Sequence, residues 1–444
     1  GSFTSGEKLS WRTLSRCLDD INKIQEVISR QRYHDLADPD LVLKDITALI
    51  HQQVPKRALD VPRMTRYAAI FGHKAVGSIL ENKIGLNIVE CYFFTLHIYS
   101  SLQREPWVNG RQTYQDFGLT EDKTAKFFSW LSRTPAELRQ VLAPFQEYGP
   151  NWAYTWNALM ETPLISISCT SQWKMICPIP SLLWSRVGSG LFYDLVKDPA
   201  FANPYGSAFE AHIGKFSKNV LEIEKFQILE EQKYKVGKQV KDGIDWVVCD
   251  SDANMFIECK TKRLQQTSKL VEAGVSLQTD LKTLAKAIVQ GYKNIIDALR
   301  GKTAWQINEK QSYLLVVTLE DWMLFPATIR VELDSIVAGL MNSERINPAI
   351  IEQIPFFHIS CEEFERMVLV VRETGIRNFL EKKLDDKYRD WLMIDFIREC
   401  FGSEARANFK LGYSTAWQEV CTEMSKDWHP SLQTKLLDTF DISA

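Results

Sequence analysis

Two short apolar runs joined by a polar turn constrain this chain more than any other feature. Residues 244–249 (IDWVVC) and 255–259 (MFIEC) are rich in side chains that favour strands, and residues 250–254 (DSDAN) have the composition of a tight turn. Two strands joined by so short a turn pair in antiparallel fashion. The sequence therefore predicts a β-hairpin over residues 244–259.

Charged side chains stand on this predicted hairpin. Successive side chains of a strand point to opposite faces, so Glu258 and Lys260 share one face while Ile257 and Cys259 share the other. Asp245 begins the preceding strand, where the hairpin would bring it beside Glu258. Two neighbouring carboxylates repel each other unless a cation lies between them. The pattern therefore indicates a cation site on the face that carries Glu258.

Hard oxygen ligands select Mg²⁺ or Mn²⁺. Such an ion activates a bound water and neutralises charge on a phosphate, and a lysine on the same face stabilises the developing charge. Glu210, on a helix expected over residues 205–218, could add a ligand or a contact to a second metal. These residues predict a metal-dependent phosphodiesterase site made of Glu210, Asp245, Glu258 and Lys260.

The elements expected around the hairpin follow one order: helix, strand, strand, strand, helix, strand. Periodicity and β propensity predict the helices at residues 205–218 and 279–299. They predict the strands at residues 220–229, 244–249, 255–259 and 312–319, with a further strand-like stretch near 354–359. The fold class expected is therefore mixed α/β, with large helical regions on both sides.

Asp245, a gap of twelve residues and then Glu258-Cys259-Lys260 resemble the signature of the PD-(D/E)xK nucleases, a superfamily that includes many restriction endonucleases. The expected element order is similar to the core of that superfamily. The resemblance implies that Asp245, Glu258 and the backbone carbonyl of Cys259 ligate Mg²⁺ or Mn²⁺, and that Lys260 is catalytic. Glu210 matches the acidic residue often found on the first core helix, and Ile244 stands where a proline is common.

The helix after the motif offers a further match. Gln290 resembles a catalytic glutamine that some branches of the superfamily carry on this helix. Those branches also carry a tyrosine four residues later, whereas Asn294 holds that position here and Tyr292 is displaced. The alternative for Gln290 and Tyr292 is that both are ordinary helix residues.

The charge balance limits how the chain could bind nucleic acid. A net charge of −3 excludes a protein that coats nucleic acid through its overall charge, so contact must come from a local patch. Residues 260–302 are rich in Lys and Arg, which could follow a phosphate backbone, although a solvated helix face is the alternative. The candidate nucleic-acid contacts are Lys262, Arg263, Lys286, Lys293 and Tyr292.

The function expected is hydrolysis of phosphodiester bonds, with DNA preferred by analogy with the superfamily. An RNA nuclease and a non-catalytic module that binds nucleic acid or protein are the alternatives. A role in restriction or anti-phage defence follows from the same analogy. The large flanking regions suit regulation by a protein partner or a ligand, and cleavage of both strands of a duplex would suit a homodimer.

The chain is expected to fall into four parts. These are a helical N-terminal region (1–147), a Trp-rich connecting segment (148–203), the nuclease domain (204–362) and a mostly helical C-terminal region (363–444). The tryptophans of the connecting segment predict interdomain packing more than a platform for bases. Nine scattered cysteines without a CxxC pair indicate reduced thiols in a cytoplasmic protein. No apolar run is long enough to span a membrane.

Overall fold

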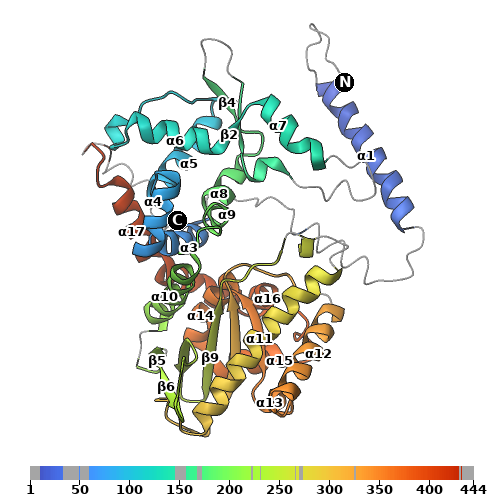
Figure 1. The fold of residues 1–444 in the computed structure, drawn as a ribbon, viewed down its shortest axis with the longest axis vertical. Helices are drawn as coiled ribbons and strands as arrows, with labels where there is room; N and C mark the ends of the chain where they lie inside the picture. Colours follow the sequence, from blue (N-terminus) through green and yellow to red (C-terminus); the bar gives the residue numbers. More distant parts are fainter. Residues whose placement is uncertain are drawn as a thin grey trace.

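The computed structural model describes residues 11–33, 50, 60–145, 157–167, 173–221, 224–230, 232–265, 267–269, 274–324, 327–429 and 432. Within these ranges the protein is a mixed α/β protein, in which a largely helical N-terminal part leads into a five-stranded sheet (Figure 1). No helix in the described ranges is long and apolar enough to cross a membrane.

Helices dominate the N-terminal part. They are α1 (Trp11–Tyr33), α3 (Val61–Phe71), α4 (Lys74–Ile84), α5 (Ile88–Leu102), α6 (Glu121–Leu131) and α7 (Pro135–Leu142). Three of these helices occupy the stretch from 61 to 102, where α4 ends at Gly85 with a φ of 83°. This left-handed conformation suits glycine, because other residues meet a steric penalty there. Asn87 and Glu90 then form a capping box that begins α5.

A small sheet crosses the N-terminal part, and the sequence did not predict it. Its strand order is β1-β4-β3-β2, with β1 (Val108–Asn109), β2 (Ser132–Arg133), β3 (Leu164–Ser166) and β4 (Lys174–Ile176). Strands of two or three residues are too short to produce a readable alternation. The helices α8 (Ser181–Val187) and α9 (Leu191–Leu195) then lead toward the central sheet.

The tryptophans of the connecting segment differ in their surroundings. Trp184 is buried, in keeping with packing, whereas Trp173 is 43% exposed. The guanidinium of Arg111 lies 3.9 Å from the centre of the Trp173 ring. Trp152 and Trp156 lie outside the described residues.

The central sheet has the order β11-β10-β9-β8-β5. Its strands are β5 (Gln227–Glu230), β8 (Trp246–Cys249), β9 (Ala253–Lys260), β10 (Gln311–Thr318) and β11 (Phe356–Ser360). β5, β8 and β9 pair in antiparallel fashion, whereas β9, β10 and β11 run parallel to one another. The predicted hairpin is therefore confirmed as β8–β9.

Two long helices complete the predicted element order. α10 (Ala202–Leu221) precedes the sheet, and α11 (Gly274–Leu299) connects β9 to β10. The strand expected over residues 220–229 is shorter than predicted, because α10 continues to Leu221 and β5 begins only at Gln227. An unpredicted hairpin of β6 (Tyr234–Val236) and β7 (Gln239–Lys241) is inserted between β5 and β8.

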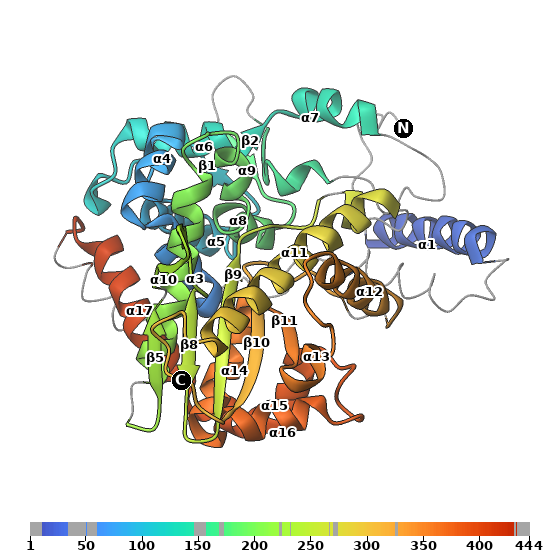
Figure 2. The ribbon, with the colours of Figure 1, turned by 60° about the horizontal axis from the view of Figure 1, so that its bottom comes forward.

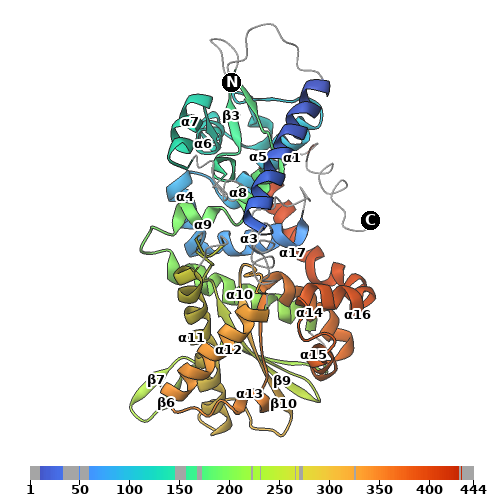
Figure 3. The ribbon, with the colours of Figure 1, turned by 90° about the vertical axis from the view of Figure 1, so that its right-hand side faces the viewer.

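Helices cover both faces of the central sheet. Figure 3 shows α11 and α12 (Ala327–Ser343) on one side, and α14 (Cys361–Thr374), α15 (Ile376–Leu384) and α16 (Met393–Ala407) on the other. The pleat sorts the side chains of β9 between two cores: Phe256 packs with α11, whereas Ile257 and Cys259 belong to the larger core on the opposite face. Alternate residues of β9 thus face different helices.

The C-terminal helices return to the N-terminal part. Residues 385–392 separate α15 from α16 and are not part of either helix. α13 (Ile350–Gln353) precedes β11, and α17 (Phe409–Ser425) follows α16. Figure 2 shows α17 beside α10, and α17 also contacts α3 and α5. One hydrophobic core therefore extends from Met64 through the sheet to Met424.

Candidate metal centre

The β8–β9 register brings Asp245 to the charged end of β9. Trp246 pairs with Ile257, so Asp245, one residue earlier, lies opposite the end of β9. Its Oδ2 accepts a 2.6 Å hydrogen bond from the backbone N–H of Cys259. In a strand the N–H and C=O of one residue point to the same side, so the carbonyl of Cys259 also points toward Asp245. The carboxylate of Asp245 and the carbonyl of Cys259 therefore lie along the same edge of β9.

Glu258 and Lys260 contact each other on one face of β9. Nζ of Lys260 donates a hydrogen bond of 2.5 Å to Oε1 of Glu258. The two side chains are close because residues two apart on a strand share a face. The Glu258 side chain is 5% exposed and that of Lys260 39%, so the pair reaches from the interior toward solvent.

The second oxygen of Glu258 is the unusual atom of this group. Oε2 is buried and has no hydrogen-bond partner among the described residues. An unsatisfied buried acceptor costs roughly 1–3 kcal/mol, and more when it carries charge. A cation bound at this oxygen would remove that cost.

Glu210 comes to the same group from α10. The Trp246 indole Nε1 donates a 2.9 Å hydrogen bond to the backbone carbonyl of Glu210, which ties α10 to β8. Gly214 permits this close approach, because a Cβ at that position would lie 2.0 Å from Cζ2 of Trp246. After burial, which has the largest effect, the charge of Glu210 adds to the rise in the pKa of both Asp245 and Glu258, so its carboxylate lies near both.

The electrostatics of the group favour a bound cation. Burial and then the charge of Glu258 raise the pKa of Asp245 to about 8. Burial also raises the pKa of Glu258, although Lys260 opposes the rise. A cation between the carboxylates would reverse both shifts, because it favours the ionised form of each. The donor set consists of hard oxygens, the set that Mg²⁺ and Mn²⁺ prefer.

Two residues of α11 have different surroundings from those expected. Tyr292 is fully buried, and its hydroxyl donates a 2.7 Å hydrogen bond to the carbonyl of Ile354. The prediction that Tyr292 contacts nucleic acid is therefore wrong, because its ring serves the packing of α11. Gln290 is exposed and donates a 3.2 Å hydrogen bond to Oδ1 of Asn294. Its catalytic role stays a prediction.

The prediction that Arg263 contacts nucleic acid is also wrong. Its side chain is 7% exposed and forms an ion pair with Glu320 at 3.3 Å. A buried guanidinium whose two Nη atoms are paired with protein groups offers no surface to a phosphate backbone. The prediction failed because a run of basic residues does not reveal which of them turn inward.

The other predicted nucleic-acid contacts lie at the surface. Lys262 forms an ion pair with Asp280 at 3.2 Å, and Lys293 forms one with Glu344 at 2.9 Å. Lys286 is exposed, and no ion pair is recorded for it within the described ranges. Lys286 is therefore the member of the set whose charge is available to a partner.

Asp280, an acidic residue within the Lys- and Arg-rich stretch, holds the segment after Lys260. It is fully buried and accepts 2.8 Å hydrogen bonds from the backbone N–H of Gln265 and from Oγ of Ser268. The available signal was an acidic residue on the apolar side of a predicted helix. Its partners lie in a loop that no periodicity identifies.

A second polar cluster lies on the opposite side of α10. His212, Cys361 and Glu365 have donor atoms within 4.8 Å of one another. Glu365, however, already accepts hydrogen bonds from Arg66 at 2.9 and 2.6 Å, from His212 at 2.8 Å and from Tyr413 at 2.9 Å. The charge of Arg66 takes the place that a metal would need, so the cluster is a buried ionic network.

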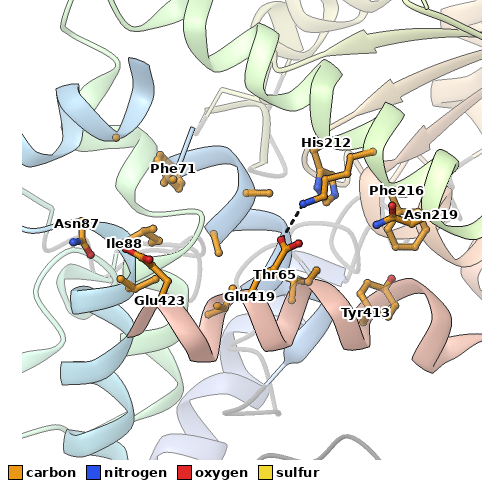
Figure 4. A pocket seen from close by; sticks show the side chains of 18 of the residues that line it. Thr65, Phe71, Asn87, Ile88, His212, Phe216, Asn219, Tyr413, Glu419 and Glu423 are labelled. Atoms are coloured by element: carbon orange, nitrogen blue, oxygen red, sulfur yellow. Dashed lines mark hydrogen bonds and ion pairs between the residues drawn. The ribbon is translucent and has the colours of Figure 1, made fainter. Parts of the chain in front are cut away.

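A pocket of about 350 Å³ lies beside this network. Figure 4 shows His212 and Phe216 of α10 facing Tyr413 and Glu419 of α17 across it. The carboxylate of Glu419 is held by Lys215 at 2.9 Å. The side chains at the opening are thus partly paired with each other, and the pocket lies where α3, α4, α5, α10 and α17 meet.

Comparison with protein-family models, with curated proteins and with solved structures gave no match for this chain.

Proposed function

We propose that this protein is a metal-dependent nuclease that hydrolyses phosphodiester bonds, with DNA as its substrate. The carboxylate of Glu258 carries the proposal, because the residue is buried and its Oε2 has no partner among the described residues. A cation shared with Asp245 would satisfy that oxygen and relieve the repulsion between the carboxylates. The order α10, β5, β8, β9, α11, β10 supports a restriction-endonuclease-like core as part of the proposal.

The residues fit Mg²⁺ or Mn²⁺. Glu210, Asp245, Glu258 and the carbonyl of Cys259 would hold the ion through oxygen ligands. When bound, such an ion supplies an activated water and neutralises charge on a phosphate.

Lys260 contributes a positive charge to the proposed reaction. Burial lowers the pKa of Lys260, whereas the charge of Glu258 and the hydrogen bond to it raise the pKa. The rise is larger than the fall, so the net shift is upward. The lysine is therefore protonated at neutral pH and donates hydrogen bonds. This state suits the stabilisation of charge developing on a phosphate oxygen, and it does not suit a general base.

The partners follow from the same proposal. Lys282 and Lys286 are exposed on α11 and offer charge to a nucleic-acid backbone. Two copies of the chain would place one centre on each strand of a duplex, which suits cleavage of both strands in restriction or anti-phage defence. The eight described cysteines are all free thiols, which supports the cytoplasm as the proposed setting.

The first experiment compares four substrates under three conditions. The purified protein is incubated with supercoiled plasmid, linear duplex, single-stranded DNA and RNA, each with Mg²⁺, Mn²⁺ or EDTA. Asp245→Asn is the test variant. Asp252→Asn is the matched control, because Asp252 is an exposed aspartate on the same hairpin.

Metal-dependent cutting of DNA that is lost in Asp245→Asn and kept in Asp252→Asn is the expected result. Cutting of RNA alone would replace DNA by RNA as the substrate. An absence of cutting together with no Mn²⁺ binding by calorimetry would reject the nuclease in favour of a non-catalytic module.

A further inference from the structure

Arg263 lies three residues beyond Lys260 and joins several separate parts of the chain. Its Nη1 donates a 2.8 Å hydrogen bond to the carbonyl of Ser189, and its Nη2 donates one of 2.9 Å to the hydroxyl of Tyr205. The guanidinium also pairs with Glu320 at 3.3 Å and lies 4.2 Å from the centre of the Phe192 ring. The buried side chain of Arg263 therefore fixes the position of the segment that follows β9.

Two partners of Arg263 belong to or directly follow elements that surround the candidate metal centre. Tyr205 is on α10, the helix that carries Glu210. Glu320 follows β10, whose Thr318 is the register partner of Lys260. A shift of Arg263 would therefore move the end of β9 relative to α10, and with it the separation of Lys260 and Glu210.

The same network reaches the helical N-terminal part. The hydroxyl of Tyr67, on α3, donates a short hydrogen bond to Glu320. Arg63 of α3 donates a 2.8 Å hydrogen bond to Oγ of Ser189, the residue whose carbonyl accepts from Arg263. α3 thus forms hydrogen bonds to Glu320 and Ser189, two residues that also bind Arg263.

We propose that Arg263 is a positioning residue for the nuclease centre and makes the geometry of Lys260 and Glu210 depend on the docked helical N-terminal part. The inference rests on the proposed nuclease function. Arginine suits this role, because its planar guanidinium has several donors in fixed directions, whereas lysine carries one mobile ammonium. Supporting groups of this kind orient the residues that contact the metal and the substrate.

Arg186 provides a matched control for a purely structural role. Its side chain is 5% exposed, pairs with both oxygens of Asp194 at 2.6 and 2.8 Å, and donates to the carbonyl of Glu161 at 2.8 Å. The guanidinium lies 4.6 Å from the centre of the Trp130 ring. Arg186 therefore resembles Arg263 in burial and contacts, but all these partners lie within the N-terminal part.

The test compares Arg263→Lys, Tyr205→Phe and Arg186→Lys in the full chain. Each variant is assayed for kcat and KM on duplex DNA, for Mn²⁺ affinity by calorimetry, and for Tm. Arg263→Lys is expected to lower kcat or Mn²⁺ affinity by about 10- to 100-fold, and Tyr205→Phe to do so less strongly. Arg186→Lys should lower Tm but leave both readouts near wild type.

Chemical rescue adds a readout that a loss of stability would not produce. Guanidinium ion added to Arg263→Ala should restore part of kcat at a temperature well below the Tm of the variant, where the loss of stability does not limit activity. If Arg263→Lys does not fold, Tyr205→Phe decides the question, because it removes one oxygen and keeps the ring.

Wild-type kcat and Mn²⁺ affinity in both Arg263→Lys and Tyr205→Phe would overturn the positioning role, and so would losses that simply follow Tm in all three variants. A wild-type protein that neither cuts nucleic acid nor binds Mn²⁺ would instead reject the nuclease function, and the positioning role with it.

Discussion

The backbone N–H of Cys259 donates a 2.6 Å hydrogen bond to Oδ2 of Asp245, and this contact fixes the carboxylate at the end of β9. The hydrogen bond opposes the rise in the pKa of Asp245, but burial and the charge of Glu258 outweigh it. The carboxylate is thus held where its ionisation is unfavourable. A structure that maintains such an arrangement without a cation loses stability, and this loss can be measured.

Asp245→Asn should stabilise the metal-free protein. Asparagine keeps an acceptor for the N–H of Cys259 and is neutral at every pH, so the metal-free fold need not take up the proton that the raised pKa of Asp245 requires. We expect the free energy of unfolding in EDTA to increase by about 1 kcal/mol, as in other trade-offs between stability and activity. Thermal denaturation with EDTA and with Mn²⁺ measures the effect, and Mn²⁺ should raise Tm only in the wild type and in the control Asp252→Asn. A variant less stable than wild type in EDTA would contradict the electrostatic account.

Metal binding should release protons in a pH-dependent way. Because the pKa of Asp245 is raised from 3.8 to about 8, the folded metal-free protein binds more protons than the unfolded chain between these values. Its stability therefore falls as pH rises from 3.8 toward 8 and then levels off. A bound cation requires the ionised carboxylate, so Mn²⁺ binding at pH 7 should release about one proton. Calorimetry in two buffers of different ionisation enthalpy measures this release, and identical heats in both would refute it.

Lys260→Ala should abolish cleavage and leave the fold nearly intact. The Lys260 side chain is 39% exposed, so its loss creates no cavity in the core. We expect kcat to fall by about 100-fold or more, because the variant loses a charge that stabilises the transition state. Steady-state kinetics and circular dichroism test both parts. Retained cleavage would remove Lys260 from the proposed machinery.

The exposed lysines of α11 should set affinity rather than rate. Lys282→Ala and Lys286→Ala should each reduce the slope of log K against log salt concentration by about 1, because each residue would release a counterion from the backbone. Fluorescence anisotropy with a labelled duplex at several salt concentrations measures the slope. Lys74→Ala, at an exposed position on α4, is the control. An unchanged slope in both α11 variants would place the nucleic acid elsewhere.

Glu365→Gln should destabilise the protein and change its response to acid. Burial alone would raise the pKa of Glu365, but the charge and hydrogen bonds of Arg66, together with His212, lower it far below 4.5. The carboxylate therefore contributes stability that is present above pH 4.5 and is lost as pH falls below it. The substitution leaves Arg66 buried without a counter-charge, which costs about 3–5 kcal/mol. Urea unfolding between pH 3 and 7 should show a smaller acid-dependent loss in the variant than in the wild type.

The sequence determined the elements of the candidate centre because their signals are local. Alternation and a short turn predicted the β8–β9 hairpin, and the pleat placed Glu258 and Lys260 on one face. Helical periodicity located α10, and hence Glu210, without any knowledge of the partners of that helix. The limits of β5 and the β6–β7 insertion were missed, because short polar strands depend on pairing more than on composition.

Only the tertiary structure decided which side chains of each element are buried, and against what. Arg263 and Lys286 look alike in the sequence, yet one is buried against Tyr205 and Glu320 while the other is exposed. Gly214 gave no sequence signal, although it lets α10 approach Trp246 and bring Glu210 toward Asp245. Periodicity reports which face of an element is apolar, whereas contacts between residues far apart in the chain depend on how the elements pack.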